Sequence, residues 1–153
     1  MATTPDAILM DTNILLRWAD AWHAQHTDAT VAVKRLRARG HALYAAPQNL
    51  VEFWNVSTRP LDRNGFGLTP AEADEALRRV EANFLLAEDT PEVYRTWRRI
   101  VVEAGVSGVQ VHDARLAACM RVHGIERILT FNTGDFTRYP GIQPLHPRDF
   151  SAP

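Results

Sequence analysis

Short apolar runs alternate with longer helical patterns along the chain, which predicts an α/β fold. Four runs have strand length and are almost continuously apolar, as strands are when helices cover both faces of a parallel sheet: residues 7–11, 42–46, 84–88 and 127–131. Between them we expect helices near residues 26–39, 48–57, 70–82, 91–104 and 112–123, with a short helix after Asn13. This order predicts a three-layer α/β/α sandwich with a central parallel sheet.

Residues typical of helix ends support these boundaries. The segment "TPAE", which begins at Thr69, is a capping box with proline at the first helical position, and Thr90 is also followed by proline. Gly40, Gly105 and Gly124 each follow a helical pattern, where a left-handed residue ends many helices. The helices are therefore delimited by local signals as well as by periodicity.

Length and composition indicate one ordinary globular domain, residues 1–153. A chain of 153 residues with 46% hydrophobic content can fill a single core. The sequence contains neither an apolar run of about 18 residues nor the features of a signal peptide, so we expect a cytoplasmic protein without membrane association. Its one cysteine, Cys119, lies in a helical pattern, where a thiol packs as a small hydrophobe.

The charge leaves the partner open but restricts the chemistry. A formal net charge of −1 does not indicate a nucleic-acid surface by itself. Of the 17 basic residues, 16 are arginine and only Lys34 is lysine, so a mechanism that needs two lysines is excluded.

Four acidic residues are expected at corresponding ends of the strand–helix units. Asp11 ends the first apolar run, Glu52 lies early in the helix after the second, Asp113 starts a helix, and Asp135 follows the fourth run. Each alone has an ordinary explanation, such as a helix first turn, a turn residue or a solvated face. Because carboxyl ends of parallel strands share one edge, we expect all four in one crevice.

Four carboxylates in one crevice repel one another unless a cation neutralises them. With no lysine nearby, a divalent metal is the natural counterion. Oxygen ligands, including Asn132, suit Mg²⁺ or Mn²⁺ better than Zn²⁺. Such a site activates water and stabilises charge on a phosphoryl oxygen, which favours phosphodiester hydrolysis.

These residues resemble a known family. The segments "MDTN", "LVEFWNVSTRP", "HDARLAA" and "ILTFNTGDF" are similar to the PIN domain, in particular the VapC toxins of type II toxin–antitoxin modules. The resemblance runs from Ile8 to about Pro147. It implies a Mg²⁺- or Mn²⁺-dependent endoribonuclease whose catalytic and metal-binding residues are Asp11, Glu52, Asp113 and Asp135, with Thr12, Asn13, Thr130 and Asn132 as supporting polar groups.

The same resemblance suggests the partners. An RNA substrate and a small protein antitoxin are implied, and we also expect a homodimer. Arg59 and Arg63, which follow the Glu52 helix, are the best-placed candidates for binding substrate phosphates, although solvated arginines on a helix face are common.

Other interpretations remain open from the sequence. Haloacid-dehalogenase phosphatases need Asp-x-Asp after the first strand, whereas Asp11 is followed by Thr12 and Asn13. A receiver-like domain needs a lysine after a late strand, and Lys34 lies in the wrong half. The sequence does not exclude a non-enzymatic metal- or protein-binding module of the same fold, or a housekeeping RNA-processing nuclease.

Overall fold

The structure is a computed structural model that describes residues 6–151. In this range it has five strands, six α-helices and four short 3-10 helices. The strands are β1 (Ala7–Met10), β2 (Ala42–Ala45), β3 (Leu85–Leu86), β4 (Arg127–Leu129) and β5 (Gln143–Leu145). The α-helices are α1 (Thr12–Ala19), α2 (His26–Ala38), α3 (Pro47–Thr58), α4 (Pro70–Asn83), α5 (Pro91–Glu103) and α6 (Val111–His123). The 3-10 helices are η1 (Leu61–Arg63), η2 (Gly108–Gln110), η3 (Thr133–Phe136) and η4 (Pro147–Phe150).

The strands form one parallel sheet in the order β3-β2-β1-β4-β5. β1 lies at its centre, with Ile8 opposite both Leu43 and Arg127. The four expected strands are present, and the sheet has a fifth, β5, that the apolar pattern did not predict. The expected run 84–88 contributes only two paired residues, and both are exposed because β3 is at the sheet edge.

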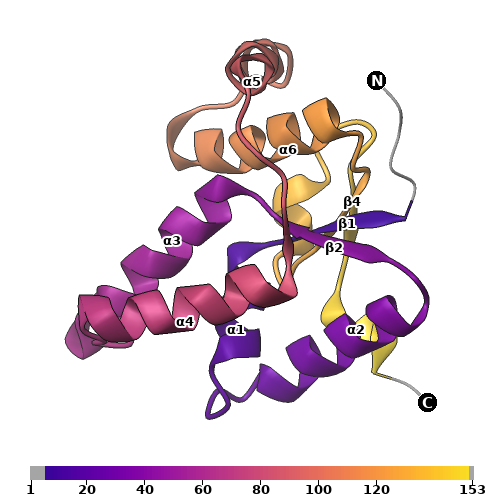
Figure 1. The fold of residues 1–153 in the computed structure, drawn as a ribbon. Helices are drawn as coiled ribbons and strands as arrows, with labels where there is room; N and C mark the ends of the chain where they lie inside the picture. The colour runs from indigo at the N-terminus through magenta and orange to yellow at the C-terminus, as the bar shows by residue number, and fades with distance from the viewer. Residues whose placement is uncertain (1–5, 152–153) are drawn as a thin grey trace.

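Helices cover both faces of the sheet, which confirms the three-layer arrangement. Side chains of α5 and α6 pack with Leu9 and Ile128 in one core. Side chains of α1 to α4 pack with Ile8 and Met10 in a second core. Figure 1 shows α5 and α6 above the sheet and α1, α2 and α4 below it. Successive residues of β1 therefore alternate between two cores, and all four are buried.

Local sequence sets the helix ends that matter for the site. The Asp11 side chain caps α1 by accepting a hydrogen bond from the backbone N–H of Thr12. Gly124 ends α6 with a φ of 67°, a left-handed value that glycine adopts without strain. None of the helices in residues 6–151 combines the length and apolarity that crossing a membrane would require.

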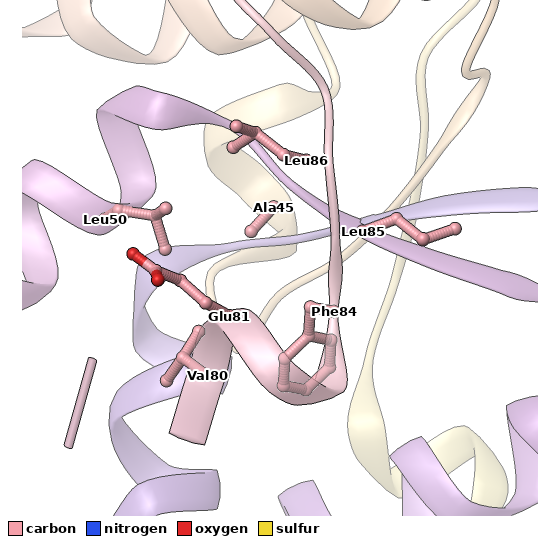
Figure 2. Close-up of a pocket in the computed structure, with 7 residues that line it drawn as sticks. All are labelled: Ala45, Leu50, Val80, Glu81, Phe84, Leu85 and Leu86. Atoms are coloured by element: carbon pink, nitrogen blue, oxygen red, sulfur yellow. The ribbon is translucent and has the colours of Figure 1, made fainter. Parts of the chain in front are cut away.

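An apolar hollow of about 230 Å³ lies beside edge strand β3. Leu50, Val80, Phe84 and Leu86 line it, and Glu81 is the acidic residue on its wall (Figure 2). The four candidate catalytic acids do not line this hollow, so the apolar hollow and the acidic positions are different regions of the molecule.

Candidate functional site

Asp11 connects the central strand to the first helix. It follows Met10 directly, and its backbone N–H still donates to Leu129 of β4, 3.0 Å away. One carboxylate oxygen, Oδ1, accepts from the Thr12 N–H at 2.7 Å; the other, Oδ2, accepts from the Thr130 hydroxyl at 2.7 Å and the Asn13 amide at 3.3 Å. The sheet and the α1 N-terminus thus fix both oxygens at the carboxyl edge.

Glu52 is held beside Asp11 by a buried polar chain. The Thr12 hydroxyl donates to Glu52 Oε2 at 2.7 Å and accepts from Asn49 Nδ2 at 3.1 Å. Asn49 is fully buried, and its Oδ1 accepts from the Ala46 N–H at the start of α3. Asn49 therefore links the fold of the β2–α3 junction to the orientation of Glu52.

Gln48 holds the other oxygen of Glu52 and reaches toward α6. Its Nε2 lies 3.0 Å from Glu52 Oε1 and 2.8 Å from the backbone oxygen of His112. Its Oε1 accepts from the Arg115 guanidinium at 3.3 Å, and Arg115 also pairs with Asp89 at 3.2 Å. One glutamine side chain thus bridges α3 and α6 next to the acids.

Asp113 and Asp135 lie in a different kind of environment. Asp113 is half-buried in the first turn of α6, and Asp135 is exposed in η3 after β4. Within residues 6–151 neither carboxylate accepts a hydrogen bond or forms an ion pair. Their side chains are therefore not fixed by polar contacts.

The electrostatics indicate that the four acids share one region. Burial, together with the charges of Glu52 and Asp135, raises the pKa of Asp11 to about 6, although the hydrogen bonds from Thr130 and Thr12 oppose the shift. Burial also raises the pKa of Asp113 to about 6, followed by the charges of Asp135, Asp11 and Glu52. The pKa of Asp11 is thus raised by two of the other acids, and the pKa of Asp113 by all three.

The donor chemistry fits a hard divalent cation, but the ligands are not already gathered around one point. No group of three or more His, Cys, Asp or Glu side chains within the described chain is arranged to hold an ion. Asp11 and Glu52 keep free lone pairs beyond their hydrogen bonds, and Asp113 and Asp135 can turn without breaking any. Mutual repulsion among oxygen donors is the situation that Mg²⁺ or Mn²⁺ relieves.

The supporting polar residues have distinct positions. Thr12, Asn13 and Thr130 all donate toward the acids, and Asn13 Oδ1 also accepts from the Phe131 N–H at 3.2 Å. Asn132 takes part through its backbone, whose N–H donates to the Thr130 hydroxyl at 3.0 Å. A backbone N–H thus orients the Thr130 hydroxyl, which in turn donates to Asp11.

Arg59 and Arg63 lie at the far end of α3. Arg59 follows Glu52 by seven residues, or about 10 Å along the helix axis. Its guanidinium donates to the backbone oxygen of Asn64 at 2.9 Å, so part of its hydrogen-bonding capacity closes the loop after α3. Arg63 is exposed in η1. The structure does not bring either arginine into contact with the acids.

Three residues of this region were not predicted from the sequence: Gln48, Asn49 and Arg115. A signal was available for the first two, because they precede Glu52 by four and three residues and therefore share its side of a helix. Nothing in the sequence marks Arg115 apart from the other arginines. Cys119 is buried as expected, and burial raises the pKa of its thiol to about 12.

Comparison with known proteins places this architecture. The model of the PIN domain family matches residues 8–142. A comparison with curated protein sequences found no match.

Several solved structures share the fold. VapBC2 of Rickettsia felis, bound to a DNA fragment from its promoter, has a TM-score of 0.67 at 12% identity, with 92% of this chain and 98% of that chain covered. A toxin–antitoxin complex from Klebsiella pneumoniae has a TM-score of 0.62 at 19% identity, covering 92% and 97%. VapC20 of Mycobacterium tuberculosis, a sarcin–ricin loop cleaving toxin, has a TM-score of 0.56 at 21% identity, covering 79% and 86%. At these identities the likeness establishes the fold.

Proposed function

This chain belongs to the PIN domain family, and from that premise we propose that it is a divalent-metal-dependent endoribonuclease, the toxin of a type II toxin–antitoxin pair. The observation that supports it most is electrostatic. Asp11 and Asp113, which are 102 positions apart in the sequence, each have a pKa raised to about 6 by burial and by the other acids. Carboxylates brought together at this cost are typical of a functional centre.

In the proposed reaction the acids have different tasks. Bound Mg²⁺ or Mn²⁺ supplies an activated water and neutralises charge on the scissile phosphate. Asp11 and Asp113 are the proposed direct ligands, and Glu52 and Asp135 bind directly or through water. Thr12, Asn49 and Gln48 hold Glu52, while Thr130 and Asn13 hold Asp11.

The partners follow from the same proposal. We expect a small antitoxin to cover the four acids, since the neighbouring structures include toxin–antitoxin complexes. A homodimer is the expected assembly. Arg59 and Arg63 are proposed to contact substrate phosphates beyond the scissile one, because Arg59 lies about two helical turns from Glu52 and Arg63 follows in η1.

A cleavage assay with purified, antitoxin-free protein tests the function. We expect structured RNA to be cut with Mg²⁺ or Mn²⁺ but not with EDTA, and Asp11→Asn and Asp113→Asn each to reduce cutting by on the order of 100-fold or more. Asp74→Asn, which changes a half-exposed acid paired with Arg78 on α4, is the matched control. Absence of cleavage across varied structured RNAs, together with calorimetry that detects no Mn²⁺ binding, would favour the non-enzymatic binding module instead.

A further inference from the structure

A second hollow adjoins the acids on the side of α3 and α6. Its volume is about 520 Å³, within the range of roughly 300 to 1,000 Å³ of small-molecule sites. Glu52 is part of its wall, so the hollow and the acidic centre share a residue. We call it the α3–α6 hollow. Its lining includes Gln48, Val51, Glu52, Asp89, His112 and Arg115.

Arg115 gives the α3–α6 hollow a positive group. It is the one Arg or Lys among the described residues that line it. Its guanidinium has five N–H donors in a planar fork, and the contacts to Gln48 Oε1 and Asp89 Oδ1 leave some of them unused. Its side chain is 37% exposed, so an incoming anion can reach it. A guanidinium fork in this situation suits a phosphate.

Gln48 sets Arg115 at a fixed position relative to the acidic centre. The same side chain donates to Glu52 Oε1 and accepts from Arg115, so these two residues lie on either side of one amide. A further bond to the His112 backbone oxygen ties that amide to α6. An anion bound by Arg115 would therefore lie at a fixed distance from a scissile phosphate bound beside Glu52.

The rest of the hollow offers surface for a base. Val51 is 70% exposed although it is apolar, and it lies on the same side of α3 as Gln48 and Glu52. The His112 side chain is exposed on the facing helix. An aromatic ring and an apolar side chain on opposite walls suit a planar base.

We propose that the α3–α6 hollow binds the nucleotide next to the scissile phosphate, with Arg115 contacting that nucleotide's phosphate. The inference rests on the proposed ribonuclease function and adds a subsite and its specificity-determining residue. Asp89 competes with the phosphate for Arg115, because both are anions directed at one guanidinium. Removing the Asp89 charge therefore strengthens substrate binding, whereas removing the Arg115 charge weakens it.

Steady-state cleavage of a labelled single-stranded RNA oligonucleotide tests this pair of opposite effects. We expect Arg115→Gln to raise KM roughly tenfold with little change in kcat, on the scale of one hydrogen bond to a charged group. Asp89→Asn should lower KM severalfold. The dependence of log KM on log salt should become shallower by about 0.7 in Arg115→Gln, the value for one phosphate contact with a single strand.

Arg95→Gln is the matched control, since Arg95 also pairs with an acid, Glu92, but lies on α5 away from the hollow. Its KM and salt dependence should equal those of the wild type. Arg115→Lys keeps the charge and guards against misfolding of the glutamine variant, and we expect an intermediate KM with the full salt slope. Thermal unfolding of each variant reports the structural contribution of the ion pair.

The outcomes separate the two proposals. If the wild type cleaves RNA but Arg115→Gln and Asp89→Asn raise KM alike with an unchanged salt slope, Arg115 only links α6 to the Asp89 loop and the subsite is wrong. If the wild type cleaves no RNA, the proposed function fails and the subsite fails with it.

Discussion

The two halves of the acidic centre differ in how the fold holds them. Asp11 and Glu52 accept hydrogen bonds on both carboxylate oxygens, from donors that are themselves oriented by backbone groups or a buried amide. Asp113 and Asp135 accept none within residues 6–151. One half is thus built before any ion or substrate arrives, and the other half can still move. A cluster of carboxylates can thus combine a rigid half with an adaptable one.

The largest expected effect comes from the adaptable half. Asp113→Asn should reduce cleavage on the order of 10² to 10³-fold, the scale of losing one group that stabilises developing charge. The metal-free fold should lose no stability, because the carboxylate accepts no hydrogen bond in the described chain and its charge is repelled by the other acids. Cleavage rates and thermal unfolding check both parts. A melting temperature clearly below that of the wild type would show that the Asp113 carboxylate makes contacts that stabilise the fold.

The next effect concerns the rigid half and is the pH dependence of the free energy of unfolding. Folding raises the pKa of Asp11 from 3.8 to about 6, so the folded chain binds this proton more tightly than the unfolded chain does. The free energy of unfolding without metal should therefore fall as pH rises from about 4 to 7, by about 3 kcal/mol at most for this group at roughly 1.4 kcal/mol per pKa unit.

Chemical denaturation at several pH values, with and without Asp11→Asn, measures this contribution as a difference. In the variant the free energy of unfolding should decline less over the same pH interval. Saturating Mg²⁺ should counter the decline in the wild type, because the ion binds the ionised carboxylates and so stabilises the fold more at higher pH. An identical pH dependence of stability in both proteins would mean that the pKa of Asp11 is not raised on folding.

The rigid half is tested through its buried amide. Asn49→Ala leaves all four acids in place but removes the donor to Thr12 and the acceptor for the Ala46 N–H. We expect a loss of about 1 to 3 kcal/mol of stability, as for a buried polar group left unpaired. Metal affinity or cleavage should fall roughly 10 to 100-fold, as for other residues that orient ligands.

Asn83→Ala provides the control, since Asn83 is an exposed asparagine on α4 whose side chain donates to the Arg79 carbonyl of the same helix. Its metal affinity, measured by calorimetry with Mn²⁺, should equal that of the wild type. Equal affinities for Asn49→Ala and Asn83→Ala would show that the buried chain supports the fold without orienting Glu52.

The smallest effect concerns Thr130. Thr130→Val keeps the side-chain shape and removes the hydroxyl that donates to Asp11 at 2.7 Å. The pKa of Asp11 should rise further, because one of the bonds that stabilise its charge is gone. The acidic limb of the pH–rate profile should therefore move to higher pH. Thr137→Val, at an exposed threonine of the neighbouring turn, should leave the profile in place.

Sequence patterns predicted the parts of the molecule whose physical cause is local. β1 is buried on both faces, so its run is continuously apolar, and the acid at its end is conspicuous for that reason. The helix positions were accurate because capping residues and glycines mark their ends. The sheet edges were not: β3 is shorter than its apolar run, and β5 contains Pro144, which an edge strand tolerates.

The hydrogen-bonded half of the site was harder to predict than its acids. Asn49 is a polar residue in a helix, which normally indicates a solvated side chain, yet it is completely buried. Its amide is satisfied by the Ala46 N–H, three positions earlier, and by the hydroxyl of Thr12, 37 positions earlier, and the second of these contacts is tertiary. Similarly, Arg115 is one of sixteen arginines, and its distinction depends on the position of Gln48 on another helix. Both residues owe their positions to contacts between different helices, which the periodicity of a single helix does not predict.

The central position of β1 has a consequence for the timing of synthesis. Its neighbour β4 begins at Arg127, so Asp11 cannot obtain its contacts from Leu129 and Thr130 until most of the chain has left the ribosome. A nascent or truncated polypeptide that stops before β4 would lack half of the environment that holds Asp11. Under the proposed function, the active centre would therefore remain incomplete until translation of the chain is nearly finished.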